Sequence, residues 1–206
     1  LAAMEMYASS GQKKYLTQAI NYGRMEPVTP WMGADSARHY QWYPFVNLGH
    51  YHLAMQESDL PARKEFIRNM RTGLQRVKER AEGDAFLNGI PFIWCSNNLA
   101  IAFITQCRLY HELTGDDSFL EIETAMRDWL LGCNPWGTSM IVGYPEQGDT
   151  PTDPHSAFTH LHRIPVTGGI VDGPVYNSIF SGLKGIYLAN DDEYAAFQSN
   201  DAVYHD

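Results

Sequence analysis

The chain has 206 residues, of which 44% are hydrophobic and 19% charged, a composition typical of a globular protein and too apolar for a disordered one. Its 15 Lys and Arg residues against 24 Asp and Glu give a net charge of −9. This charge disfavours binding to nucleic acid or to an anionic membrane, since both require a basic face. No apolar run approaches the length of a membrane span, and no signal peptide is recognisable. We expect a single domain, 1–206, that belongs to a longer protein.

Helical periodicity of the apolar residues dominates the first two thirds of the sequence. Helices are predicted at 1–9, 12–22, 36–55, 62–81, 96–113 and 119–131. Loops are predicted at 25–33 and 83–93. The first of these loops is expected because Pro27 and Pro30 interrupt the helical pattern, and Gly11 separates the first two helices. Ser96 or Asn97 is the expected N-cap of the helix that follows the second loop.

Residues 134–174 differ from the rest of the sequence, because they are rich in Gly and Pro and follow no sustained period. A loop of this length in a compact domain is usually functional. The few strand signals of the sequence, at 139–142 and 169–171, both lie inside it. Helices are expected again at 175–188 and 191–197.

A weak internal repeat relates two of the predicted helix pairs. Tyr7–Gly11 is followed by Tyr15-Leu16, and Tyr110–Gly115 is followed by Phe119-Leu120. In each copy an aromatic–Leu pair comes four and five residues after a Gly-centred turn. Repeated αα-hairpins are typical of solenoids and of closed rings of helix pairs, so the sequence predicts an all-α fold.

The sequence contains none of the common short motifs of nucleotide-binding, metalloprotease or serine-hydrolase sites: the Walker, Rossmann, HExxH and GxSxG patterns are all missing. His50 and His52 are two positions apart on a predicted helix and point in different directions, so they cannot bind one metal ion together. His160 and His162 have no acidic residue or Cys at ligand spacing. Cys107, in an apolar helical run, is interpreted as a buried, inert thiol. We expect no metal and no cofactor.

Three clusters of polar and aromatic residues remain, at 31–42, 94–98 and 134–174. The start of the third cluster, WLLGCNPWGTSM at 129–140, resembles the YLLGxNPxGxSY stretch of glycoside hydrolase family 9, the cellulases and related β-glucan hydrolases. Further similarities follow in the family's order: 139–144 resembles SYVTGFG, Pro154-His155 resembles PHHR, 168–174 resembles GxLVGGP, and Tyr204-His205-Asp206 resembles the opening of the second family signature.

The resemblance implies a fold, a substrate class and a location. The fold is an (α/α)6 toroid of αα-hairpins, of which this chain supplies a part, with the loop at 134–174 over one end of the ring. The substrate is a β-linked glucan or a related oligosaccharide, and the location is secreted, periplasmic or at the cell surface. Partners other than the substrate would be the missing parts of the parent chain, with no nucleic acid.

The implied chemistry is inverting hydrolysis of an O-glycosidic bond without a cofactor. Inversion requires two carboxyl groups about 6.5–9.5 Å apart, so that the attacking water fits between them. By the resemblance, the Asp pair that holds this water precedes Leu1, and the acid Glu follows Asp206 by nine residues. We therefore expect this chain alone to be inactive.

The resemblance also assigns roles to single residues. His155 is expected to bind sugar hydroxyls beside the cleavage point, and Asp206 to be a catalytic-site carboxylate. The Arg that the family carries two positions after this His is Ala157 here, and Arg163 is the candidate to replace it. The family's Gly after its GF pair is Pro145. These departures indicate a sugar other than that of cellulose, or a shorter substrate.

Aromatic rings are the other candidates for substrate binding, because a flat ring can stack on the apolar face of a pyranose. The candidates are Trp94, Trp136 and Tyr144, and we expect Trp94 and His155 to open to one groove. Core packing is the alternative for Trp94, a buried structural role is the alternative for His155, and a solvated chain end is the alternative for Asp206.

Three functions stay open from the sequence. The first is a cellulase-like glycoside hydrolase, and the second is a non-catalytic helical scaffold that binds carbohydrate. The third is another sugar-active enzyme on a helical toroid, such as an epimerase or an unsaturated-glycan hydrolase. Sequence on either side of this chain would discriminate between them, since only the first function requires an Asp pair upstream and a Glu downstream.

Overall fold

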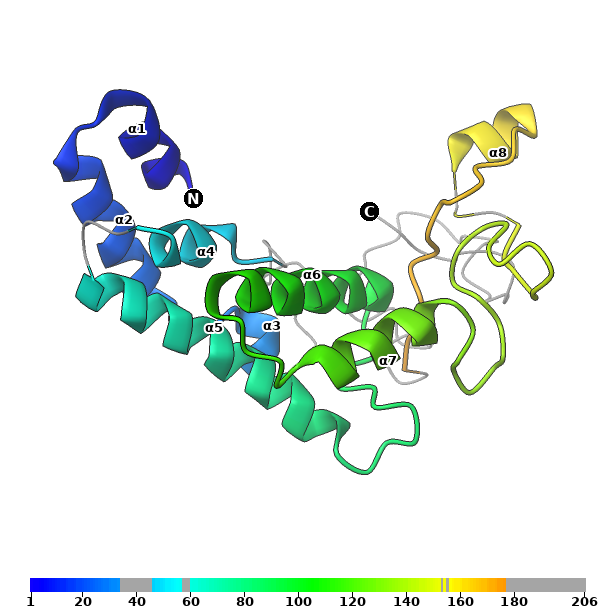
Figure 1. Ribbon diagram of the computed structural model, residues 1–206. Coiled ribbons are helices and arrows are strands. Elements are labelled where there is room, and N and C mark those ends of the chain that lie inside the picture. The colour runs from blue at the N-terminus through cyan, green and yellow to red at the C-terminus, as the bar shows by residue number, and fades with distance from the viewer. Residues whose placement is uncertain (34–45, 57–59, 153, 155, 177–206) are drawn as a thin grey trace.

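The computed structural model describes residues 1–33, 46–56, 60–152, 154 and 156–176, and in these ranges the regular structure is helical (Figure 1). The helices are α1 (Ala2–Ser10), α2 (Lys13–Met25), α3 (Pro30–Gly33), α4 (Leu48–Ala54), α5 (Leu60–Ala81), α6 (Ser96–Thr114), α7 (Leu120–Leu130) and α8 (Ala157–His162). Extended pairing in the described part is limited to isolated bridges inside the long loop. The all-α prediction is confirmed.

The helices form an array of packed pairs (Figure 1). Helix α1 packs on α2, α4 on α5 and α6 on α7. Contacts of α4 with α1 and α2 join the first pair to the second, and the contact of α5 with α6 joins the second pair to the third. In Figure 1, α1 and α2 lie at one end of the array, whereas α8 and the loop that follows α7 lie at the other. The long loop therefore lies at one end of the helical array, and its predicted place over one end of the complete ring stays a prediction.

The two copies of the internal repeat have the same turn geometry. Gly11 and Gly115 follow α1 and α6 in the left-handed conformation, with φ of 66° and 68°. Their backbone N–H groups donate to the carbonyl oxygens of Tyr7 and His111 at 2.8 and 2.7 Å. A Cβ at either glycine would meet nothing within 4 Å, so the glycines are needed for the backbone conformation and not for space.

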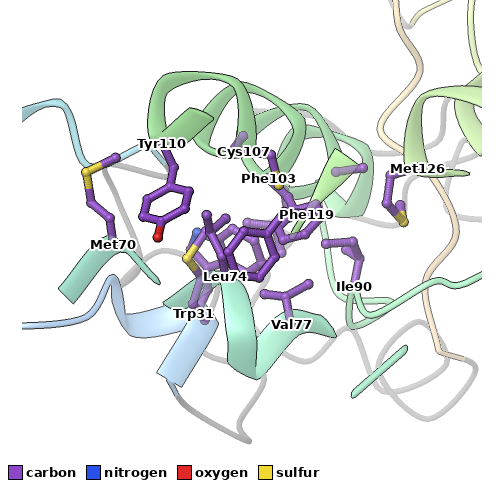
Figure 2. Close-up of a cluster of buried hydrophobic side chains, with 14 of the residues drawn as sticks. Trp31, Met70, Leu74, Val77, Ile90, Phe103, Cys107, Tyr110, Phe119 and Met126 are labelled. Carbon is purple, nitrogen blue, oxygen red and sulfur yellow. The ribbon is translucent and has the colours of Figure 1, made fainter. Parts of the chain in front are cut away.

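A continuous hydrophobic core joins α3, α5, α6 and α7, and Figure 2 shows side chains from each of them. Trp31 of α3, Leu74 and Val77 of α5, Phe103 of α6 and Met126 of α7 have no exposed surface. Burying each of these side chains stabilises the fold by about 1.5–3 kcal/mol. The helix pairs are held together mainly by this shared core.

Residues 30–33 form the short helix α3, where the sequence predicted a loop. Proline is tolerated in the first turn of a helix because its missing N–H has no partner there in any case. Trp31 and Met32 are fully buried, and a Cβ at Gly73 of α5 would lie only 2.8 Å from the Met32 sulfur. Burial of these two side chains against α5 overrides the local loop signal.

Helix α4 begins at Leu48, whereas the sequence predicted a helix over 36–55. The first part of that range lies outside the described residues, but Val46 and Asn47 are described and are not helical. Asn47 is the N-cap, and its side-chain Oδ1 accepts a hydrogen bond from the backbone N–H of His50 at 3.0 Å. This cap sets the start of α4, so the helix that the apolar periodicity predicted does not extend back through Asn47.

Asp116 holds the turn between α6 and α7. Its carboxylate accepts hydrogen bonds from the backbone N–H and the hydroxyl of Ser118 and from the hydroxyl of Tyr110, and it pairs with Arg71 of α5. These interactions, those with Ser118 above all, lower the pKa of Asp116 to about 2. One carboxylate thus connects α5, α6 and the start of α7.

We expect Asp116→Ala to lower the free energy of unfolding at pH 7 by about 1–3 kcal/mol, since it removes an ionised acceptor shared by three side chains. Because the pKa of Asp116 is lower in the folded state than the ordinary 3.8, its contribution is present above pH 3.8 and is lost as the pH falls towards about 2. The destabilisation, measured by urea unfolding, should therefore be smaller at pH 3 than at pH 7.

The matched control is Asp117→Ala, because the neighbouring Asp117 side chain is 73% exposed and contacts only His111 among the ion pairs of the described residues. Its removal should cost less than about 0.5 kcal/mol. Equal losses from the two variants, or a loss from Asp116→Ala that does not change with pH, would contradict the role of Asp116.

Candidate functional site

The long loop after α7 is closed at its base by a short antiparallel pairing. The two segments with strand signals in the sequence pair with each other, through a bridge between Ile141 and Ile170. Beside it, the backbone N–H of Val142 donates to the carbonyl oxygen of Gly169 at 2.8 Å. The two segments therefore pair with each other, but through an isolated bridge and not as regular strands, and the loop leaves and returns at one fixed place.

The returning segment crosses the N-terminus of α6. The backbone N–H of Asn97 donates to the Asp172 carbonyl (2.9 Å), and its side-chain Nδ2 donates to the Val171 carbonyl (2.7 Å). The Ser96 hydroxyl donates to the Pro174 carbonyl at 2.8 Å. The first N–H groups of a helix have no partner within the helix. Here the first turn of α6 uses its donors to hold the loop.

Two predictions differ from the structure around this attachment. The N-cap of α6 is Cys95, in a left-handed conformation with φ of 60°, and not Ser96 or Asn97. Both of those side chains bond to the loop and are therefore not available for capping. The helix predicted at 175–188 does not start at Val175, since Val175 and Tyr176 are not helical, and the rest of that range lies outside the described residues.

Gly173 makes the close contact between the loop and α6 possible. A Cβ at this position would lie 2.5 Å from the Ser96 hydroxyl oxygen and 2.6 Å from Asn97 Oδ1. The backbone of Gly173 also has φ of 97°, a conformation that residues with a side chain rarely adopt. Both the space and the conformation therefore require glycine.

Asn134 organises the turn that opens the loop. The side chain is 5% exposed, and its Nδ2 donates to the carbonyl oxygens of Trp129 (2.9 Å) and Thr138 (2.7 Å). Its Oδ1 accepts a hydrogen bond from the backbone N–H of Trp136 at 3.1 Å. Three of the four hydrogen bonds that an amide side chain can make are thus used to fix this turn. The turn presents Trp136 at the surface, where the residue is 53% exposed.

The other predicted site residues are spread over the loop. Tyr144 is 49% exposed and lies in the tight turn that follows the paired base. Arg163 is exposed, has φ of 52° and directly follows α8, which projects from the helical array in Figure 1. His155 and Asp206 lie outside the described residues, so their roles stay predictions.

Trp94 is buried. Its side chain is 3% exposed and belongs to the hydrophobic core beside the start of α6. A ring in this position has no open face on which a sugar could stack, so it does not line the groove that we expected it to share with His155. Its burial corresponds to the core packing that the sequence left as the alternative.

Ring contacts identify two residues that the sequence analysis did not select, Phe92 and Tyr176. The ring centroid of Phe92 lies 6.0 Å from that of Trp136, 5.6 Å from that of Tyr176 and 6.1 Å from that of Trp129. The backbone N–H of Tyr176 also donates to the Phe92 carbonyl at 2.8 Å. These rings come from separate segments, and no spacing in the sequence connects them. In the sequence, the aromatic side chain was the only feature that could have marked Phe92 and Tyr176 as candidate binding residues.

Within the described ranges, no group of three or more His, Cys, Asp or Glu side chains is arranged to hold a metal ion. No helix in the same ranges is both long and apolar enough to cross a membrane. Cys107 is buried on α6, and burial, with the nearby Glu123 carboxylate, raises the pKa of its thiol. The thiol therefore stays protonated, in agreement with the inert role predicted for it.

The arrangement of αα-hairpins with a long loop over one end is that of part of an (α/α)6 toroid. A crystal structure of a Zn-binding triple mutant of GH family 9 endoglucanase J30 has a similar fold, with a TM-score of 0.67 and 19% sequence identity. The match covers 88% of this chain and 33% of that chain, so the similarity extends over about a third of that protein's length.

The family model of glycosyl hydrolase family 9 matches residues 1–206, and the chain belongs to this family. No curated protein matches the chain. The family resemblance given by the motifs of the long loop is thereby confirmed, and it extends to the helical part, where the motifs were sparse.

We expect Gly173→Ala to lower the free energy of unfolding by about 3 kcal/mol or more, because the new Cβ collides with the first turn of α6 and strains the backbone. Gly168→Ala is the matched control. Gly168 also has a positive φ, of 86°, but a Cβ there meets nothing within 4 Å, so only the conformational cost of about 1 kcal/mol remains.

Urea unfolding measures both losses, and limited proteolysis within 143–167 reports whether the loop has detached from α6. Gly173→Ala should speed this cleavage and Gly168→Ala should not. Similar unfolding free energies for the two variants would show that the contact with α6 does not hold the loop.

Proposed function

We propose that this chain is the loop-bearing part of a family 9 glycoside hydrolase, and that the complete protein hydrolyses β-linked glucan or a related oligosaccharide outside the cytoplasm. Family membership over residues 1–206 supports the general activity. The similar solved structure is described as an endoglucanase, which supports a glucan substrate. The observation that carries the proposal is the fixed attachment of the 134–174 loop to α6, because this loop contains the motifs of the family.

The proposed reaction is inverting hydrolysis. The carboxylate base that activates water and the acid that protonates the leaving oxygen would come from residues outside this chain, as the motif order implies. The residues of this chain would bind and orient the sugar. His155 would hold sugar hydroxyls, and Asp206 would lie near the acid, where its negative charge raises the pKa of that acid. Both assignments follow from the resemblance.

The geometry of α8 bears on the choice of substrate. Ala157, at the position of the family's Arg, is the first residue of α8, and Arg163 follows its last residue. At about 1.5 Å of rise per residue, the backbone of Arg163 is about 9 Å further along the helix axis. Arg163 would therefore reach a different part of a bound sugar than an Arg at position 157. This difference supports a sugar other than that of cellulose, or a shorter substrate.

A non-catalytic carbohydrate-binding scaffold is the second candidate function. The observation in its favour is the pair of half-exposed rings, Trp136 and Tyr176, on one connected aromatic cluster. Stacking of a sugar on these rings needs no catalytic carboxylate. The two functions differ in whether a bound glucan is cleaved.

The test compares the 206-residue chain with a longer polypeptide that contains it together with the upstream Asp pair and the downstream Glu. The short chain should release no product from an aryl β-glucoside or from β-glucan, because each missing acid or base role is worth about 10² to 10⁴ in rate. The longer polypeptide should release reducing sugar whose first-formed anomer, observed by NMR, is inverted.

Turnover by the 206-residue chain above a buffer blank would contradict the placement of the catalytic groups outside it. A longer polypeptide that retains β-glucan without cleaving it would replace the hydrolase with the scaffold. Retention of anomeric configuration would overturn the inverting mechanism.

A further inference from the structure

Positive charge in this protein is concentrated on one helix. Helix α5 carries seven of the 15 Lys and Arg residues but two of the 24 Asp and Glu residues. Its net charge is therefore +5, whereas the rest of the chain has a net charge of −14. In Figure 1, α5 runs along one edge of the helical array, so an acidic protein presents one basic helix at its edge.

Three of these cations lie in one row on the exposed face of α5. Lys64, Arg68 and Arg76, which we call the basic row, follow the four-residue spacing that places side chains on one ridge of a helix. Thr72 occupies the remaining position of this series. All four residues are exposed. At about 1.5 Å of rise per residue, the row extends for about 18 Å along the helix.

The cations of the basic row have no acidic partner in the described part of the chain. Their side chains make no ion pair and no hydrogen bond with any residue that the structure describes. The two acidic residues of α5 are used elsewhere. Glu65 pairs with Arg24 of α2 at 2.8 Å, and Glu79 accepts a hydrogen bond from Gln75 at 3.1 Å. Hydrogen bonding to Arg24 chiefly lowers the pKa of Glu65, and the charge of Arg68 adds a smaller effect.

The basic row differs from the cations of α5 that hold the fold together. Arg71 pairs with Asp116, and the Lys78 ammonium donates to the Ser118 carbonyl at 2.9 Å. In the row, by contrast, like charges four positions apart repel each other and destabilise the helix. No contact within the described residues offsets this repulsion, and a bound anion would. Such a local cost without a structural return is expected where a surface has a function.

The shape and the surroundings of the basic row limit the anion that it can bind. A nucleic-acid duplex or a flat anionic membrane would also face the rest of the chain, whose negative charge repels it. A ridge one helix wide suits a single thin polyanion instead. The planar fork of Arg binds carboxylates through two hydrogen bonds. The Thr72 hydroxyl donates to the Arg68 carbonyl at 2.9 Å and keeps its acceptor positions for a sugar hydroxyl.

We propose that the basic row binds a single chain of a carboxylated polysaccharide, a polyuronate, along the outer face of α5. The choice of a polysaccharide rests on the proposed function, because a hydrolase that acts on glucan outside the cytoplasm meets other polysaccharides in the same material. The row lies on α5 and not on the loop that carries the family motifs (Figure 1). It would hold the protein on its surroundings without occupying the site of hydrolysis.

The test measures binding of oligogalacturonate to the 206-residue chain by isothermal titration calorimetry at low salt. The triple variant Lys64→Gln, Arg68→Gln, Arg76→Gln should weaken binding about tenfold or more, since each exposed ion pair is worth a factor of about 1.5–5. Raising the salt concentration from about 20 to about 500 mM should also weaken binding by the unchanged chain, because exposed charges are screened. Methyl-esterified oligogalacturonate, which keeps the sugar and loses the charge, should bind poorly.

The matched control is the triple variant Lys13→Gln, Lys14→Gln, Arg127→Gln, which removes the same charge from exposed positions of α2 and α7. It should bind oligogalacturonate as the unchanged chain does. By urea unfolding, the basic-row variant should be at least as stable as the unchanged chain, because it relieves repulsion between like charges.

Four results would overturn the proposal. They are no binding by the unchanged chain, equal weakening in the two triple variants, equal affinity for the esterified ligand, and a basic-row variant that is less stable than the unchanged chain. Tighter binding of poly-L-glutamate than of oligogalacturonate of similar length would also overturn it, in favour of an acidic protein segment.

A second measurement separates this proposal from the proposed function. In the longer polypeptide, the basic-row variant should hydrolyse soluble β-glucan with unchanged kcat and KM, and a change in either would contradict the separation of the row from the site of hydrolysis. Hydrolysis by a longer polypeptide that does not bind oligogalacturonate would refute the basic row and leave the hydrolase intact. Oligogalacturonate binding that depends on the row, without hydrolysis of β-glucan, would refute the hydrolase and support the basic row.

Discussion

The loop-bearing end of this protein depends on the contact of Gly173 with the first turn of α6. At this point the backbone of the returning loop lies so close to Ser96 and Asn97 that no side chain fits between them. The carbonyl groups on either side of Gly173 accept hydrogen bonds from that turn. Helix α6 is also part of the hydrophobic core, so the core fixes the place at which the loop is attached. The loop is therefore an extension of the helical core and takes its orientation from it.

The helices could be predicted from the sequence wherever one apolar face continued without interruption. Helices α5, α6 and α7 follow the predicted ranges within a few residues, because their buried positions recur at helical spacing. The errors occur where a local signal competed with burial. Helix α3 forms because Trp31 and Met32 are covered by α5, which the nearby prolines do not reveal. At Asn47 the reverse happens, since one capping side chain interrupts a continuous apolar pattern.

Only some residues of the candidate site could be predicted, because they were selected from contiguous motifs and not from apolar periodicity. The motifs of the loop are contiguous stretches, so Trp136 and Tyr144 could be selected from the sequence, and both are about half exposed. Residue type alone does not show burial, and Trp94 lies in the core. Phe92 contacts both Trp136 and Tyr176 only after the loop has folded back over α6, and these contacts have no counterpart in local sequence spacing.

The pairing at the base of the loop fixes where the loop leaves and re-enters the helical part, whatever the length of the chain between these two points. The outgoing segment is bonded to the end of α7, where the Met140 N–H donates to the Leu130 carbonyl, and the returning segment is bonded to α6. The chain between Ile141 and Ile170, including α8, extends away from the helices (Figure 1). Asp149, within this excursion, accepts a hydrogen bond from the backbone N–H of Ser139 at 2.9 Å, so only insertions or deletions beyond Asp149 would leave the hydrogen bonds of the base unchanged. The outer part of a loop anchored in this way can therefore change in length and sequence during evolution without a compensating change in the helical core.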